Sequence, residues 1–194
     1  MMANAGPSVA VLKSWRQIYQ TDNLLRQCQD EICGGYGLTV EQYAVLIVLN
    51  YAGGSARITD IARWLIRSTN SITMIVDRMV KAGLVKRTRD RVDRRVVNVT
   101  PTSRAENSFK LAIPAGWEFI HKIMLPLSEA DRHTLARLLE TIRYEALNYL
   151  NPREDIQAMV VNDDKSHIKM MERLFHDALL STPQAKHQSG KRKP

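Results

Sequence analysis

The sequence predicts a mainly α-helical chain with one small two-stranded β-hairpin. Three observations predict this fold class. Apolar residues recur at three- and four-residue spacing along most of the 194 residues, as on one side of amphipathic helices. Two short runs rich in valine and threonine, residues 84–88 and 95–99, have the composition of paired strands. Glycine and proline occur between these segments, where they end helices and form turns.

The first two helices are expected over residues 8–32 and from Thr39 onward. The first has apolar residues at helical spacing and ends at the glycine-rich run 34–37. Thr39 is followed three positions later by Gln42, which is the pattern of a capping box. The second helix continues through the apolar run 43–49, so we expect it to be mostly buried, and a pair of glycines ends it.

A short helix at Ile58–Leu65 is followed by a longer helix at Thr69–Ala82. Ser68 is suited to cap the longer helix, and Gly83 follows it as a terminating glycine. The apolar residues of the longer helix fall on one side of it, and its polar residues occupy the opposite side. The apolar set is Ile72, Ile75, Val76, Met79 and Val80.

The hairpin is expected directly after this helix. Its strands are Leu84–Thr88 and Arg95–Val99, and the charged run Asp90–Arg94 forms its tip. Because a two-stranded hairpin is marginally stable by itself, it must pack against the helices.

Helices resume after the hairpin. One is expected from Pro101 to about Met124, with a kink at Pro114, and another from Ser128 to Leu150. A final amphipathic helix is expected over Asp164–Leu180. From Thr182 onward the chain is polar and basic, and we expect it to be disordered.

Positive charge is concentrated in one module. The formal net charge is +8, yet residues 57–95 alone hold 11 basic and 4 acidic residues. Residues 183–194 add four basic residues and no acidic ones, so the rest of the chain is slightly acidic. A basic module in an otherwise acidic chain indicates a polyanionic partner.

A short helix, a tight turn, a capped helix and a basic hairpin together form a winged helix-turn-helix. The major groove of DNA admits one α-helix, which must be apolar on one side and carry small polar residues on the other. The residues expected to contact DNA from this helix are Ser68, Thr69, Asn70, Ser71, Thr73, Met74 and Arg78. Asp77 lies on the same side, where an acid opposes phosphate binding, so we expect it to hold a neighbouring arginine in place.

Basic residues flank this helix and line the hairpin. Those expected to contact DNA are Arg57, Arg67, Lys81, Lys86, Arg87, Arg89, Arg91, Arg94 and Arg95. Contacts to phosphates position a protein on the duplex but carry little sequence information. The arginines of the hairpin are suited to an adjacent, narrow minor groove.

The order of these motifs resembles the MarR family of transcriptional regulators. The resemblance covers about residues 8–150 and is most specific over residues 38–100. It lies in Leu38-Thr39, Gln42-Tyr43, Leu46, Ile58-Thr59-Asp60-Ile61-Ala62, Ser68, Ser71-Ile72-Thr73, Asp77-Arg78-Met79, Ala82-Gly83-Leu84-Val85-Lys86-Arg87, Asp93-Arg94-Arg95 and Val99-Thr100. The chain differs from the family pattern at Thr102–Ala105, where a glycine often stands, and it continues about 44 residues beyond the usual end.

The resemblance implies a homodimer that binds a pseudo-palindromic operator, most often as a repressor released by a small phenolic or other aromatic effector or by oxidation. It also implies that Arg95 is a minor-groove arginine and Asp93 its supporting acid. The implied organisation is an N-terminal dimerisation helix, a DNA-binding domain, a helical dimerisation region, an extension with one amphipathic helix, and a basic tail. Their bounds are 1–37, 38–100, 101–150, 151–182 and 183–194.

Several residues have two interpretations. Five aromatic residues could line an effector pocket, but a position in the core or a dimer interface is the favoured interpretation of each: Trp15, Tyr19, Tyr43, Trp64 and Trp117. Cys28 lies on an apolar stripe and is expected to be a small buried residue. Cys33 lies beside the glycine-rich run, which we expect to be exposed, and is the better candidate for a redox sensor.

Two alternative functions therefore accompany the main one. The winged helix could bind protein instead of DNA, or the chain could be a thiol-based redox-sensing repressor that uses Cys33. We expect no enzyme activity, because no catalytic triad order, phosphate-binding glycine loop or carboxylate pair is recognisable. We expect no cofactor and no metal site, with His121 and His133 on helix surfaces. The longest apolar run is too short to span a membrane and no secretory signal is readable, so a cytoplasmic location is expected.

Overall fold

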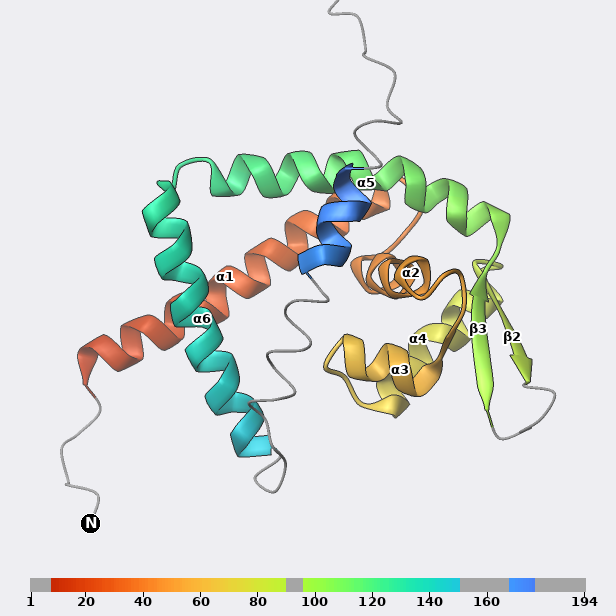
Figure 1. Cartoon of the computed structure of the whole chain (residues 1–194), viewed down its shortest axis with the longest axis horizontal. Helices are drawn as coiled ribbons and strands as arrows, with labels where there is room; N and C mark the ends of the chain where they lie inside the picture. Colours follow the sequence, from red (N-terminus) through yellow and green to blue (C-terminus); the bar gives the residue numbers. More distant parts are fainter. Residues whose placement is uncertain (1–7, 90–95, 151–167, 177–194) are drawn as a thin grey trace, which may run out of the picture. The chain divides into compact units, whose positions relative to one another are not determined.

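The computed structural model describes residues 8–89, 96–150 and 168–176. The chain divides into two compact units, Met1–Ala112 and Ile113–Pro194, and each is described by itself (Figure 1). Within the described ranges, no helix is both long and apolar enough to cross a membrane.

The first unit begins with α1 (Val9–Gly34) and α2 (Val40–Tyr51). The predicted capping box is confirmed: the Gln42 amide donates to Thr39 Oγ1 at 3.2 Å, and the Thr39 amide donates to Gln42 Oε1 at 3.0 Å. As predicted, α2 is largely buried, with Val45 and Leu49 inaccessible to solvent.

The helix-turn-helix consists of α3 (Ile58–Trp64) and α4 (Thr69–Lys81). Ser68 caps α4 as predicted, because its side chain accepts a hydrogen bond from the Ser71 amide. Four of the five predicted apolar positions of α4 are buried and form the centre of the core, whereas Val80 lies at the exposed edge. Gly83 follows α4 at φ +69°, where an L side chain would be strained, and its amide and that of Leu84 bond to carbonyls of the last turn.

The predicted two-stranded hairpin is present, and a third, short strand extends it to a three-stranded sheet. β2 (Val85–Arg89) and β3 (Val97–Pro101) form the hairpin, but β1 (Ala56–Arg57) pairs with the other side of β3, in the order β1-β3-β2. Ala56 and Arg87 both lie opposite Val99, which is fully buried. A strand of two residues is too short for an alternating pattern, so sequence periodicity does not show it.

The second strand of the hairpin ends two residues later than predicted. Pro101 is the last residue of β3 and lies opposite Val85, whereas we expected it to open the next helix. Thr102 makes the connection: its hydroxyl donates to the Gly83 carbonyl and accepts a hydrogen bond from the Ala105 amide. α5 (Ser103–Met124) therefore begins two residues after Pro101 and includes Pro114 in its interior.

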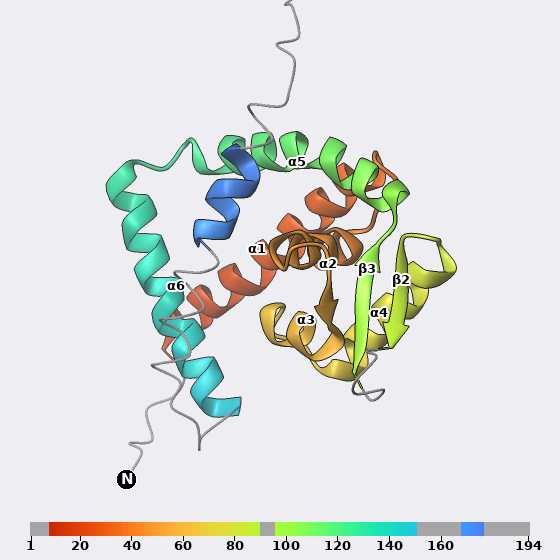
Figure 2. The same ribbon diagram turned by 45° about the vertical axis from the view of Figure 1, so that its right-hand side comes forward.

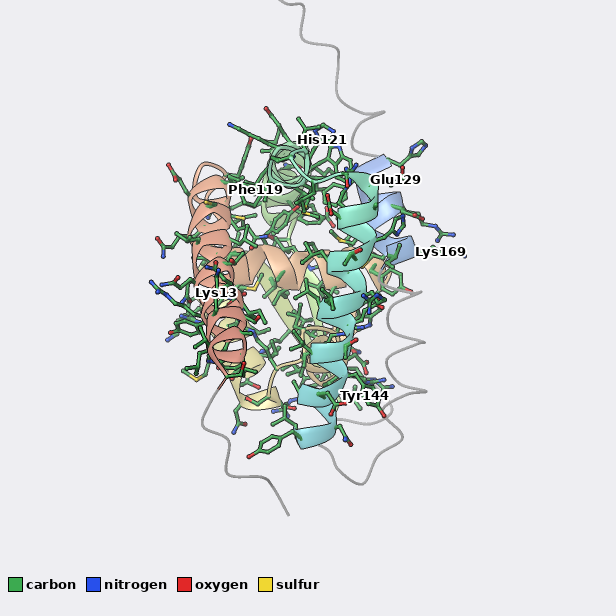
Figure 3. All side chains as sticks on the ribbon, turned by 90° about the vertical axis from the view of Figure 1, so that its left-hand side faces the viewer. Lys13, Phe119, His121, Glu129, Tyr144 and Lys169 are labelled. Carbon is green, nitrogen blue, oxygen red and sulfur yellow. The ribbon has the colours of Figure 1, made fainter. Side chains whose placement is uncertain are left out.

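The second unit contains the rest of α5, α6 (Glu129–Leu150) and a helical segment at residues 168–176. Ser128 caps α6 as predicted, accepting a hydrogen bond from the Asp131 amide at 3.1 Å. The segment 168–176 is the described part of the predicted last helix, and Phe175 packs its ring on that of Trp117 with centroids 5.0 Å apart. Figure 3 labels Glu129 and Tyr144 on α6 and Lys169 on this segment. The predicted basic tail lies outside the described residues.

Candidate nucleic-acid interface

The outward side of α4 is polar and free of tertiary packing. Asn70 is exposed on the first turn, and Met74, one turn later, is 65% exposed. The hydroxyls of Ser71 and Thr73 already form hydrogen bonds within the protein: Ser71 Oγ lies 2.8 Å from Ser68 Oγ, and Thr73 Oγ1 donates to the Thr69 carbonyl. Asn70 therefore carries the side-chain amide that is most available for a hydrogen bond on this face.

One flank of α4 is linked to the sheet through an acid of the helix itself. Arg87 of β2 places Nη1 2.6 Å from Asp77 Oδ1, and its Nη2 donates to the Thr73 carbonyl at 3.2 Å. This confirms the prediction that Asp77 holds an arginine. It also changes the interpretation of Arg87, which is half-buried and engaged, whereas we expected a residue open to phosphate.

The other flank of α4 is linked to α2 through Glu41. Its Oε1 accepts from Arg67 Nη1 at 2.9 Å, and its Oε2 accepts from Arg78 Nη2 at 3.2 Å. Sequence reasoning missed Glu41, because α2 is remote from the helix-turn-helix along the chain. Both arginines were expected at the interface, but the pairing shows that they share one carboxylate.

The remaining described cations of the module are solvent-exposed. Arg57 precedes α3, Lys81 ends α4, and Lys86 and Arg89 lie on β2. β2 contacts α4, and the two elements lie side by side in both ribbon views (Figures 1 and 2). The predicted hairpin residues Arg91, Asp93, Arg94 and Arg95 lie outside the described residues.

Of the five aromatic residues proposed for an effector pocket, the four in the first unit do not meet at one place. Trp15 and Tyr19 are exposed on α1, Trp64 packs edge-on against Tyr51, and Trp117 belongs to the second unit. Tyr43 packs its ring against Phe109 of α5, with centroids 5.4 Å apart.

Tyr43 has a feature that the other four lack. Its hydroxyl is buried and has no hydrogen-bond partner among the described residues. Burial and the nearby Cys33 thiol raise the pKa of Tyr43 above its ordinary value, so the hydroxyl keeps its proton well into the alkaline range. A buried O–H without a partner can donate a hydrogen bond to an oxygen atom of a bound molecule.

The two cysteines have the opposite environments from those expected. Cys28 is exposed, whereas we predicted a buried residue. Cys33 is only 4% exposed, whereas we predicted a surface position, because the chain turns back over it to begin α2. Burial, and to a lesser extent the charge of Asp30, raise the pKa of the Cys33 thiol to about 11, which opposes formation of the reactive thiolate.

A groove lies between α1, α2 and α4. It consists of two adjoining pockets of about 320 and 350 Å³, which share Arg26, Val40, Glu41 and Ile75. None of the five aromatic residues lines either pocket. The charged lining includes both arginines that bind Glu41, so the groove lies directly beside α4.

Comparison with known proteins agrees with this geometry. The model described as MarR family matches residues 38–97, which span α2 to the start of β3. The transcriptional activatory protein BadR of Rhodopseudomonas palustris is 31% identical over 131 residues, which cover 65% of this chain and 74% of that protein. The chain belongs to the MarR family. Members of this family are transcriptional regulators and not enzymes.

Solved MarR-family structures share the fold. The organohalide-sensing regulator RdhR-CbdbA1625, in a form bound to 2,4-dichlorophenol, superposes with a TM-score of 0.69 at 21% identity. The match covers 79% of this chain and 94% of that one. A MarR mutant from E. coli in complex with operator DNA gives a TM-score of 0.63 at 19% identity, over 70% of this chain and 99% of that one. At these identities the likeness shows the fold alone.

Proposed function

We propose that this chain binds a specific duplex operator by inserting α4 into the major groove. The observation that carries the proposal is the division of α4 into two sides. Ile72, Val76 and Met79 are fully buried on one side, while Asn70 and Met74 are exposed on the other, with cations beside them. A helix of this kind fits the groove without disturbing the core.

Different residues have different roles in this proposal. The Asn70 amide is suited to a bidentate contact with adenine, and the apolar Met74 side chain to a thymine methyl group. The exposed cations contact phosphates and set the position on the duplex: Arg57, Lys81, Lys86 and Arg89. For the hairpin tip we keep the hypothesis that Arg91, Arg94 and Arg95 enter the minor groove and that Asp93 supports Arg95.

The operator is bound by a homodimer in this proposal. α1 exposes a stripe of large apolar side chains that includes Leu12, Trp15 and Tyr19. α6 likewise exposes Leu138 and Ile142. Soluble monomers rarely leave such stripes uncovered. A two-fold dimer would read two half-sites about 10–10.5 base pairs apart.

A small aromatic effector controls binding in this proposal. The unpartnered Tyr43 hydroxyl and the neighbouring Phe109 ring supply a hydrogen-bond donor and a stacking surface. The regulator RdhR-CbdbA1625 was solved with a chlorinated phenol, which has matching chemistry. We propose repression as the mode of action, since occupying the duplex is sufficient to block access to it. Operator binding also places the protein with the chromosome, in the cytoplasm.

The test is selection of fragments of the host genome by the full chain, with the Asn70→Ala variant in parallel. The wild type should enrich a small set of fragments that contain an inverted repeat. Asn70→Ala should lose about 1–3 kcal/mol on the enriched site and relax preference at one base pair of each half-site. A wild type that enriches no fragment at low salt would contradict the proposal and favour a winged helix that binds protein.

A further inference from the structure

Glu41 lies in the first turn of α2, whose backbone is held in place by two sets of hydrogen bonds. The capping box closes the first turn of this helix, and the Val40 amide donates to Asp30 Oδ1 of α1 at 2.8 Å. The carboxylate of Glu41 lies in that same turn, where the helix dipole favours a negative charge. Its position is therefore set by α1 and α2, not by the helix-turn-helix.

The two arginines that Glu41 binds come from different parts of the helix-turn-helix. Arg67 lies in the turn between α3 and α4, and Arg78 lies in the second half of α4. Each uses a different oxygen of the carboxylate. Arg67 and Glu41 are 32% and 33% exposed, so this pair is partly shielded from solvent and salt, whereas Arg78 is 64% exposed.

The turn that carries Arg67 has a strained backbone. Ile66 has φ +50°, a left-handed conformation that a β-branched residue rarely adopts. Such strain persists where surrounding contacts determine the conformation. The Arg67 amide bonds to the Ala62 carbonyl, and its guanidinium bonds to Glu41, so both ends of this residue are fixed.

We propose that Glu41 is a specificity-determining residue that clamps Arg67 and Arg78; this rests on the operator binding proposed above. The clamp has two effects. It holds the recognition helix against α2, and it keeps two guanidinium groups from binding phosphates of any sequence. Because phosphate contacts stabilise all duplexes alike, restraining them increases the difference between the operator and other DNA.

The Glu41→Gln variant tests the clamp directly. Its affinity for a scrambled duplex should rise, and the slope of log K against log salt should become steeper by about 0.9 for each guanidinium released. One additional contact means an about 3.5-fold greater loss of affinity between about 50 and 200 mM salt. Affinity for the enriched genomic fragment should not rise, so the ratio of specific to non-specific binding should fall.

Asp22→Asn is the matched control. It makes the same change in net charge and releases Arg26. The Asp22–Arg26 pair, however, lies within α1, with its two residues four positions apart, and does not involve the helix-turn-helix. The specificity ratio of this variant should equal that of the wild type. An equal fall in both variants would show an effect of net charge and overturn the clamp.

Arg78→Gln supplies a second test that does not depend on the folding of the Glu41 variant. If Glu41 holds Arg78, removing Arg78 alone should leave the salt slope on scrambled DNA nearly unchanged. If Arg78 is a free phosphate contact, the slope should become shallower by about 0.9. That result, or an unchanged ratio in folded Glu41→Gln, would overturn the clamp while operator binding stands. A wild type without any preferred duplex would instead overturn the proposed function.

Discussion

At the end of α3, the residue Ile66 occupies a backbone position that usually requires glycine. α3 and α4 end in the same motif, in which the next two amides bond back to carbonyls of the last turn. α4 has Gly83 at the left-handed position of this motif, but α3 has Ile66 there. Ile66 is 58% exposed, so burial of its side chain contributes little stability that could offset the cost of the strained backbone.

Replacing Ile66 should therefore reverse the usual order of alanine and glycine. At φ +50° the Cβ of alanine is unfavourable, so Ile66→Gly should be more stable than Ile66→Ala by about 1 kcal/mol. Chemical denaturation of the two variants measures the difference. A more stable Ile66→Ala would show that the turn relaxes to an ordinary conformation.

Cys33 should make the protein less stable at alkaline pH. The pKa of its thiol is raised to about 11 in the folded chain, so above the pKa of the unfolded thiol only the unfolded state loses this proton. The stabilisation is thus fully present below about pH 8 and is lost as the pH rises toward 11. Tyr43 acts in the same direction, because its pKa is also raised.

Denaturation of the wild type and Cys33→Ala between pH 8 and 11 measures this effect. The difference in unfolding free energy between them should shift by an amount on the order of 2 kcal/mol across the range. A constant difference would mean that the Cys33 thiol ionises as easily in the folded chain as in the unfolded one. The same result would restore Cys33 as a candidate for oxidation.

At the scale of elements, α4 is held between two ion pairs. Arg87 links it to the sheet through Asp77, and Glu41 links it to α2 through Arg78. Exposed ion pairs contribute about 0–1 kcal/mol each, so the apolar side of α4 supplies most of its stability. The two pairs connect α4 to the sheet on one flank and to α2 on the other.

Arg87→Ala should therefore weaken operator binding without changing its salt dependence. The guanidinium is engaged by Asp77 and the Thr73 carbonyl, so its loss releases no phosphate contact. Lys86→Ala, one residue earlier on β2 and exposed, should instead make the salt slope shallower by about 0.9. DNA-binding titrations at several salt concentrations distinguish the two variants. A shallower salt slope for Arg87→Ala would mean that Arg87 contacts a phosphate, and would contradict a purely structural role between β2 and α4.

The sequence predicted the elements better than the links between them. Local signals identified the caps at Thr39, Ser68 and Ser128 and the terminating Gly83, because each acts within a few residues. β1 was missed because two residues carry no periodic pattern and form a strand only by pairing with β3. Glu41 was missed because its partners are 26 and 37 residues away, and the environments of the two cysteines depended on how α1 is covered.

At the scale of the whole molecule, the exposed apolar stripe of α1 predicts self-association. Trp15→Glu should dissociate the dimer, because a buried charge without a partner is costly at an interface. The chain itself should still fold, since Trp15 is exposed within it. Gln17→Glu is the control, because Gln17 lies on the opposite side of α1 from Trp15.

Sedimentation of both variants at micromolar concentration measures this prediction. Trp15→Glu should sediment as a monomer and Gln17→Glu as a dimer. A monomeric wild type, or a dimer that tolerates Trp15→Glu, would contradict an interface that includes α1.

We propose that α4 reads a specific duplex. The most direct test is the affinity of the full chain for its most enriched genomic fragment and for a scrambled duplex of equal length, at low and at physiological salt. We predict that the genomic fragment binds at least about 10³-fold more tightly at physiological salt, and that binding to the scrambled duplex falls steeply as salt rises. Equal affinity for the two duplexes, or binding that does not depend on salt, would contradict the claim.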